Sequence, residues 1–445
     1  MTMNLDELRA QVSAGEVDTV LLNIADMEGR LQGKRLTATH FLNDVLEEGV
    51  EGCNYLLTVD TDMDTVSGYE MASWEKGYGD FEMEPDLDTL RPIPWHEKTV
   101  LLMADAMWED GEPVVASPRQ ILRRQLDRLE ERGLIANAAT ELEFIVFNNT
   151  YEDAWKRAYR DLEPANQYNV DYSMLGTARV EPLIRRIRNS MAGAGLVVEN
   201  SKGECNFGQH EINFRYADAL TTADEHVIFK NGAKEIAAQE ECAITFMAKW
   251  DQREGSSCHV HISLANRDDG KNAFAADQKM FDHFIAGQLE HLRALTLFYA
   301  PNINSYKRFA HGSFAPTAVT WGKDNRTCSL RVVGHGEGLR VENRLAGADV
   351  NPYLAISALI AAGLDGIDNE IELPPPVEGN AYTGDDETVP SNIYAARDLF
   401  RDSALANEAF GEEVVRHYVR RAEVEIEKFE AAVTDWERFR GFERL

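Results

Sequence analysis

The chain has 445 residues, of which 44% are hydrophobic and 9% aromatic, and 45 basic against 76 acidic residues give a formal net charge of −31. This length predicts two domains with sizeable cores. The acidity excludes the basic surface on which nucleic-acid binding depends, so we expect no nucleic-acid partner.

Membrane insertion and export are not expected either. The chain contains no stretch of eighteen or more apolar residues, and a membrane span needs about that many. Its N-terminus, MTMNLDELRA, lacks the apolar core of a signal peptide. The five cysteines are scattered and odd in number, which is typical of a reducing compartment. These features together predict a cytoplasmic protein.

The first predicted elements along the chain are strands within residues 18–36, around a turn at Glu28-Gly29. Residues 115–133 have the pattern of an amphipathic helix, with Ser117 as its N-cap and Pro118 in its first turn. The polar stretch WEDGEP precedes this helix. We therefore expect a domain boundary there, with domains at 1–112 and 113–445.

The rest of the chain alternates further helices with short strands. Residues 371–392 are rich in proline and acidic residues and are predicted to be a loop. The predicted helices span 177–195, 222–241, 276–298, 351–364 and 411–433.

Four of the short strands have an unusual polar face. Side chains alternate across a strand, so residues i and i+2 share a face. The shared faces carry Glu141 and Glu143; Glu211, Asn213 and Arg215; His259, His261 and Ser263; and Arg340, Glu342 and Arg344.

For any single strand, the simpler interpretation is a sheet with one apolar and one solvated face. Solvated faces normally carry Lys, Thr, Ser and Gln, whereas these four carry mainly Glu, His and Arg. Carboxylate and imidazole ligands suit Mg²⁺ or Mn²⁺, and arginines bind phosphate and carboxylate groups. The pattern therefore predicts metal-dependent phosphate chemistry without naming a substrate.

Six motifs in order resemble those of the glutamine synthetase family. They are ELEF at 141–144, ECNFGQHE at 204–211, SCHVHISL at 257–264, NSYKR at 304–308, NRTCSLR at 325–331 and RVENRLAGADVNPYLAISALIAAGLDG at 340–366. DMEGRLQGKR at 26–35 is similar to the N-terminal domain of that family. The resemblance covers essentially the whole chain.

This resemblance implies an α+β fold, with an N-terminal β-grasp domain and a catalytic domain whose antiparallel strands form a funnel flanked by helices. It implies two or three Mg²⁺ or Mn²⁺ ions per site. The implied ligands are Glu143, Glu204 and Glu211 for one ion, and Glu141, His259 and Glu342 for another.

The resemblance also assigns substrate-binding roles. Arg308, Arg344 and Gly255 match glutamate-binding positions, and Tyr216 and Ser263 match nucleoside-binding positions. The positions that contact phosphate correspond to Arg326, Arg331 and Arg340. Of these, Arg326 and Arg340 are the expected catalytic residues.

The activity so implied is ATP-dependent ligation. The side-chain carboxylate of glutamate attacks the γ-phosphoryl group of ATP, and an amine then displaces phosphate from the γ-glutamyl phosphate. The expected assembly is a homo-oligomeric ring, a hexamer or dodecamer, with active sites between neighbouring subunits.

The sequence departs from ammonia-using members of the family at the amine site. Those members have a glutamate six residues after the NSYKR arginine, where this chain has Phe314. Asn54 stands near the position of an ammonium-binding aspartate, and Glu254 replaces an asparagine that is usual before Gly255. The loss of two acids favours a primary amine over ammonia as the nucleophile.

The identity of the amine stays open. Asp60 and Asp62, in an acidic loop, are candidates for binding the second ammonium of a polyamine, although a solvated loop explains them equally well. Nearby aromatic residues favour a small monoamine such as ethanolamine. The alternatives are a glutamine synthetase that uses ammonia and a catalytically silent ligand-binding relative.

Overall fold

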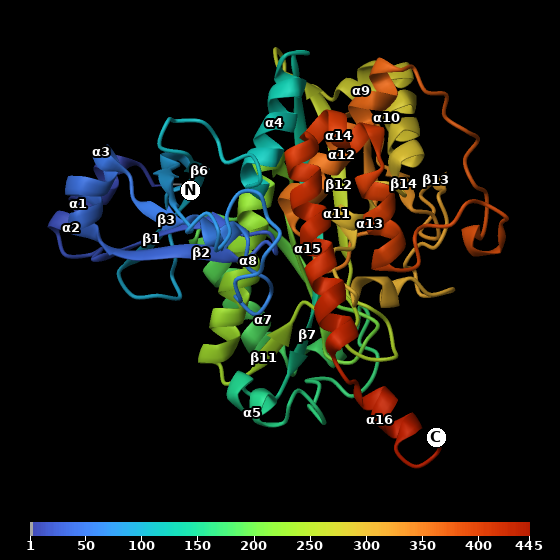
Figure 1. Ribbon diagram of the computed structural model, residues 1–445, viewed down its shortest axis with the longest axis horizontal. Coiled ribbons are helices and arrows are strands. Elements are labelled where there is room, and N and C mark those ends of the chain that lie inside the picture. Colours follow the sequence, from blue (N-terminus) through green and yellow to red (C-terminus); the bar gives the residue numbers. More distant parts are fainter. Residues whose placement is uncertain (1–2) are drawn as a thin grey trace.

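The computed structural model describes residues 3–445, which fold into two β-sheets and the helices that pack on them (Figure 1). The expected α+β class is confirmed. Among the described residues, no helix is both long and apolar enough to cross a membrane.

The first sheet is built from N-terminal residues. Its strands run in the order β2-β1-β6-β4-β3, with β5 pairing to β6, and all pairs except β1 with β6 are antiparallel. These strands are β1 (Thr19–Ala25), β2 (Leu31–Thr37), β3 (Glu51–Cys53), β4 (Asp80–Pro85), β5 (Arg91–Pro92) and β6 (Thr99–Met107).

Both faces of β1 are buried, because the sheet has its own core and also packs on the remainder of the chain. Val20 and Leu22 belong to the core of the first sheet, whereas Leu21 belongs to the main core. The predicted turn between β1 and β2 is present, with Gly29 at φ +70°. The side-chain amide of Asn351 donates to the carbonyls of Asp26 and Met27 and so fixes this turn against the body.

The second sheet carries the polar strands. Its order is β13-β14-β15-β12-β7-β9-β8, with β10 and β11 pairing to β7. Its pairs are antiparallel, as expected, except for the parallel pair of β13 with β14. These strands are β7 (Leu134–Phe147), β8 (Val198–Gly203), β9 (Gln209–Phe214), β10 (Ala217–Asp218), β11 (Ala243–Thr245), β12 (Cys258–Asn266), β13 (Trp321–Lys323), β14 (Leu330–Val333) and β15 (Arg340–Asn343).

Helices pack on both sheets, and short ones lie in the loops. Those before residue 200 are α1 (Leu5–Ser13), α2 (Ala38–His40), α3 (Leu46–Glu48), α4 (Pro118–Glu130), α5 (Tyr151–Lys156), α6 (Met174–Thr177) and α7 (Glu181–Gly193). Those after it are α8 (Ala219–Gln239), α9 (Ala273–Ala276), α10 (Gln278–His291), α11 (Thr296–Tyr299), α12 (Pro352–Asp368), α13 (Ile393–Arg401), α14 (Ala404–Phe410), α15 (Glu412–Ala431) and α16 (Asp435–Gly441).

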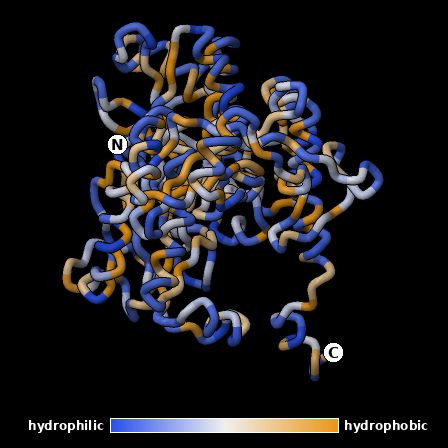
Figure 2. The backbone as a smooth tube through the Cα atoms, turned by 90° about the vertical axis from the view of Figure 1, so that its left-hand side faces the viewer, coloured by the Kyte–Doolittle hydropathy of each residue, from blue (hydrophilic) through white to orange (hydrophobic). Residues whose placement is uncertain are grey.

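The apolar helix α12 lies at the centre of the helical layer and packs closely on α10. A Cβ atom at Gly287 of α10 would lie 2.1 Å from the carbonyl oxygen of Ala362, so only glycine allows the two backbones to approach this closely. The tube view shows apolar residues gathered inside the body, while the C-terminal end with α16 extends away from it (Figure 2).

Two predicted helices have different limits in the structure. The helix expected at 276–298 is interrupted after His291, and the hydroxyl of Thr296 donates to the carbonyl of Leu292 at this break. The helix expected at 177–195 begins only at Glu181, because Pro182 belongs in a first turn. The first sheet ends at Met107 and α4 begins at Pro118, and the domain boundary predicted between them stays a prediction.

Candidate active site

A polar cavity of about 520 Å³, the chamber, lies over the second sheet. On β7, Glu141 and Glu143 line the chamber, whereas Leu142 and Phe144 point to the main core. The alternation of side chains along one strand thus separates the charged residues from the core. The same holds on β12, where His259 lines the chamber and Val260 is buried in the core.

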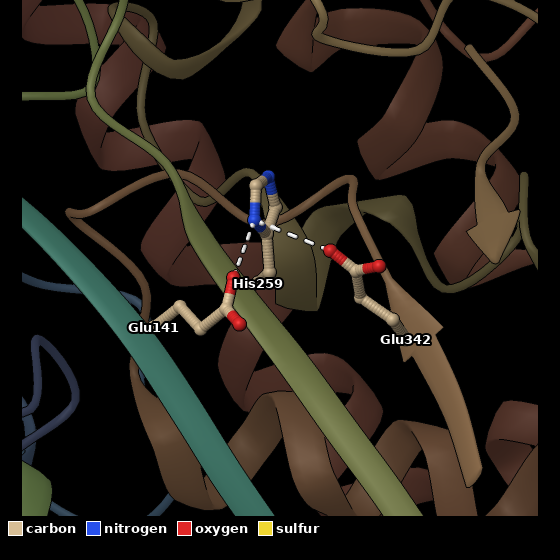
Figure 3. Close-up of side chains that lie close together, drawn as sticks. All are labelled: Glu141, His259 and Glu342. Carbon is tan, nitrogen blue, oxygen red and sulfur yellow. Dashed lines mark hydrogen bonds and ion pairs between the residues drawn. The ribbon is translucent and has the colours of Figure 1, made fainter. Parts of the chain in front are cut away.

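Strand register brings the first group of possible ligands together. Glu141 of β7 is the direct partner of His259 of β12, and β15 brings Glu342 beside them. The Nδ1 atom of His259 is 3.1 Å from Oε2 of Glu141 and 3.4 Å from Oε1 of Glu342. The three side chains point toward one another (Figure 3), and their ligand atoms all lie within 4.8 Å of each other.

A second group, Glu143, Glu204 and Glu211, lies beside the first. Glu143 of β7 is the direct partner of Glu211 of β9, and ligand oxygens of all three residues lie within 4.8 Å of one another. The carboxylate of Glu143 is held in place by the backbone N–H of Ser257, at 2.8 Å, and by the side-chain amide of Gln209, at 2.9 Å. We call these three residues the three-glutamate cluster.

The electrostatics of the chamber favour cation binding. Burial and the neighbouring Glu143 raise the pKa of Glu211 to about 8. Burial and the nearby Arg344 lower the pKa of His259, which favours the neutral imidazole, the form that binds a metal. Burial alone would raise the pKa of Glu141, but hydrogen bonds from His259 and His261 outweigh it and hold that pKa below its ordinary value.

The proposed glutamate-binding residues line the chamber. The buried guanidinium of Arg308 donates to the carbonyls of Leu345, at 2.6 Å, and Arg344, at 2.8 Å. The buried Nε of Arg344 has no hydrogen-bond partner among the described residues, as expected of a donor that awaits a ligand. At Gly255 a Cβ atom would lie 2.4 Å from Cγ of Arg308, so glycine is required there.

The arginines assigned to phosphate divide between two adjoining cavities. Arg326 and Arg331 line the chamber, and Nη1 of Arg331 is 2.9 Å from Oε2 of Glu342. Arg340 lines a neighbouring cavity of about 390 Å³, as do Tyr216 and Ser263. Glu141 lines both cavities, so the nucleoside and phosphate positions adjoin the possible metal ligands.

Of the four candidate amine-binding residues, only Phe314 lines the chamber. Its side chain is 56% exposed, and its φ of +57° is rare for a bulky residue. Asn54 is buried, and its backbone N–H donates to the carbonyl of Gly79 at the edge of the first sheet. It therefore does not reach the chamber of its own chain.

The expectation that Asp60 and Asp62 serve the amine is not supported within one chain. Both line a different cavity, next to α15, and both form ion pairs with Lys428, at 3.1 Å for Asp62. Lys428 also pairs with Asp64, at 3.0 Å. These acids were expected to bind a positive charge of the amine. Lys428 of the same chain supplies a positive charge there instead, and it lies 364 residues from Asp64 in the sequence.

The sequence interpretation missed Lys202, which also lines the chamber. Lys202 lies on β8, a strand that was not among the four polar strands, and is the direct partner of Glu211 on β9. Its nearness in sequence to Glu204 was the available signal, but the contact with Glu211 depends on the pairing of β8 with β9.

A model of the glutamine synthetase catalytic domain matches residues 115–440. The chain therefore belongs to the glutamine synthetase family. It is 62% identical to the γ-glutamylethanolamide synthetase GlnA4 of Streptomyces coelicolor, over 100% of this chain and 96% of that protein. It is 37% identical to a glutamate–isopropylamine ligase of a Pseudomonas species, over 97% of this chain and 96% of that protein.

A solved structure agrees with this assignment. The fold matches that of a GmaS/ADP complex with a TM-score of 0.86 and 26% sequence identity, covering 99% of this chain and 100% of that chain. The two proteins therefore share their overall fold.

Proposed function

We propose that this protein is an ATP-dependent glutamate–amine ligase that converts glutamate and a primary amine to a γ-glutamylamide, with release of ADP and phosphate. The observation that carries the proposal is the convergence of six oxygen and nitrogen ligands beside the unpaired Nε donor of Arg344. The names of two relatives, a γ-glutamylethanolamide synthetase and a glutamate–isopropylamine ligase, support the same reaction class.

The two ligand groups suit divalent cations. Carboxylate and neutral imidazole donors, with no thiolate among them, are those expected for Mg²⁺ or Mn²⁺. Glu141, His259 and Glu342 would hold one ion and the three-glutamate cluster another, and a third ion is compatible with the family resemblance. Bound ions would neutralise charge that develops on the transferring phosphoryl group.

The protein's own residues would orient the substrates. Arg308 and Arg344 would hold the carboxylates of glutamate, and the free Nε of Arg344 is available for this contact. Arg326, Arg331 and Arg340 would bind phosphate oxygens, because a guanidinium forms two parallel hydrogen bonds with such groups. The side-chain carboxylate of glutamate then attacks the γ-phosphoryl group, and an amine displaces phosphate from the acyl phosphate.

The rim of the chamber favours an amine with a carbon substituent over ammonium. Phe314 presents an aromatic side chain where ammonia-using relatives carry an acid, and an aromatic ring packs on methylene groups but cannot accept a proton. A short monoamine such as ethanolamine is favoured. A polyamine is second, because Asp60 and Asp62 are already paired with Lys428.

A homo-oligomeric ring, as a hexamer or dodecamer, is part of this proposal. The C-terminal segment exposes Trp436, Phe439 and Phe442, with 68%, 77% and 93% of their surface accessible. Exposed apolar surface of this kind is typical of contacts between protein chains. A neighbouring subunit would also be the source of any acidic residue, such as one near Asn54, that reaches the amine.

A phosphate-release assay with mass detection of the product tests the function. The purified protein is given Mg²⁺, ATP and glutamate, together with ammonium, ethanolamine, isopropylamine, putrescine or spermidine. We expect γ-glutamylethanolamide to form fastest. Turnover with ammonium equal to that with the best amine would support a glutamine synthetase instead, and no turnover with any amine would support a silent relative.

A further inference from the structure

The side chain of Lys202 reaches into the three-glutamate cluster. Its Nζ atom forms an ion pair with Glu204 and lies 3.6 Å from Oε1 of Glu211, and its side chain is only 21% exposed. Because Lys202 and Glu211 are direct partners on β8 and β9, this contact is set by strand register. The ammonium group therefore lies where two of the three carboxylates of the cluster converge.

The other ligand group, formed by Glu141, His259 and Glu342, is contacted by arginine guanidinium groups. Arg331 and Arg344 contact only one of its members, Glu342, and Arg331 is also held by Asp324. A guanidinium is planar and keeps a fixed direction, whereas the ammonium of lysine is a compact charge on a flexible chain. Among the positively charged side chains of the chamber, Lys202 therefore most closely occupies the position that a metal ion would take.

We propose that Lys202 is a built-in counter-ion of the three-glutamate cluster, whose ammonium pairs with Glu204 and lies beside Glu211 in the ion-free protein, and that it must withdraw before a divalent ion binds there. This inference rests on the proposed role of the cluster as a metal site. It makes ion binding an exchange of one cation for another, so the apparent affinity for the ion is lower than that of the carboxylates alone.

Neighbouring side chains would stabilise the displaced ammonium. In its observed position the Nζ atom is already 5.0 Å from the centre of the Tyr172 ring, within the range of a cation–π contact. A carboxylate oxygen of Asp171 lies within 4.8 Å of one of Glu204, so Asp171 is close enough to take over the ion pair. A small movement of the lysine side chain would transfer its charge from Glu204 to Asp171 without exposing it to an apolar environment.

Titration of the metal-free protein with Mn²⁺ tests this exchange, with calorimetry for affinity and electron paramagnetic resonance of free Mn²⁺ for the number of sites. Lys202→Met removes the charge and keeps the length, Lys202→Arg keeps the charge, and exposed Lys34→Met is the matched control. We expect Lys202→Met to tighten one Mn²⁺ site by about tenfold or more at an unchanged number of sites. Lys202→Arg and Lys34→Met should not tighten it.

Two outcomes would overturn the inference. Unchanged affinity in Lys202→Met would show that the lysine does not compete with the ion, and weaker binding would show that it helps to hold the site together. A further variant, Glu211→Gln, separates this inference from the proposed function. If Glu211→Gln leaves the number and affinity of Mn²⁺ sites as in the wild type, the cluster is not a metal site at all.

Asp171→Asn examines the second position of the lysine. We expect this change to weaken Mn²⁺ binding when Lys202 is present and to have no effect in the Lys202→Met background, because the two residues then no longer interact. An equal effect in both backgrounds would rule out Asp171 as the residue that receives the ammonium.

Discussion

Two regions of the molecule bury several charges each, and they do so in opposite ways. Around Arg119, which is 1% exposed, the guanidinium contacts Asp86, Asp105 and Asp224 at 2.6–2.9 Å. Every charge in this cluster has a partner of the opposite sign. In the chamber, by contrast, carboxylates lie next to one another, and the pKa of Glu211 is raised to about 8 by burial and by Glu143.

The difference separates charges that hold the fold from charges that bind a ligand. The Arg119 cluster joins β6, through Asp105, to α4 and α8, through Arg119 and Asp224, and thereby ties the first sheet to the rest of the chain. In the three-glutamate cluster, Lys202 supplies one positive charge beside three carboxylates, and this imbalance costs stability unless a divalent cation is bound. A buried cluster whose negative charges are not all paired with positive charges is a site where a ligand is expected.

The largest effect should come from a change in the chamber. Glu141→Ala is expected to lower the rate of γ-glutamylamide formation by about 10³-fold or more, because it removes a ligand from one ion and an oxygen that lines both cavities. The free energy of unfolding of the metal-free protein should change little. Exposed Glu131→Ala is the control, and activity retained in Glu141→Ala would disprove the ligand role.

The opposite pattern is expected in the Arg119 cluster. Arg119→Met leaves buried Asp224 without its ion-pair partner and leaves Asp86 and Asp105 with Arg123 alone. It should lower the free energy of unfolding by about 3–5 kcal/mol, while the number of Mn²⁺ sites stays the same. Arg123 shares Asp86 and Asp105 but is 35% exposed, so Arg123→Met should cost less than about 1 kcal/mol. Denaturant unfolding measures both, and equal losses would show that burial does not distinguish the two arginines.

The ligands of the chamber could be predicted from the sequence, whereas the Arg119 cluster and several contacts of the charged residues could not. The alternation of Glu141 and Glu143 with apolar residues places both acids on one face, and family motifs supply the other ligands. The contacts of Lys202 with Glu211 and of Lys428 with Asp62 depend on strand pairing and on the packing of α15. Neither follows from local periodicity. The left-handed backbone of Phe314 likewise carries no signal in its residue type.

The two regions should also respond differently to pH. Between the ordinary pKa of 4.5 and about 8, folded metal-free protein keeps a proton on Glu211 that the unfolded chain has lost. Its free energy of unfolding should therefore fall as pH rises through this window, by up to about 1.4 kcal/mol per pH unit. Glu211→Gln should abolish this slope.

The Arg119 cluster should make the free energy of unfolding change with pH in the opposite direction and at lower pH. Burial opposes the effect, but Arg119 and Arg123 hold the pKa of Asp86 below its ordinary value of 3.8. The stability that this carboxylate contributes is present above that pH and is lost as pH falls further. Denaturant unfolding across the pH range separates the two contributions, and a wild-type slope retained in Glu211→Gln would contradict the assignment to Glu211.

The smallest expected change concerns the rim of the chamber. Phe314→Glu restores the acid of ammonia-using relatives and should raise the ratio of ammonium to ethanolamine use by about tenfold. Phe314→Leu, which keeps an apolar side chain, should leave the ratio near that of the wild type, as should Asp62→Asn. Competition between the two amines, with mass detection of both products, measures the ratio. No change in Phe314→Glu would show that this residue does not select the amine.

Side chains from separate strands converge in the chamber, where we expect them to hold divalent cations beside a nucleotide phosphate. Anomalous diffraction from crystals grown with Mn²⁺ and ADP would locate these ions. We predict Mn²⁺ peaks between Glu141, His259 and Glu342 and within the three-glutamate cluster, with the nucleotide phosphates next to them. Mn²⁺ bound elsewhere on the protein, with both groups empty, would contradict this account.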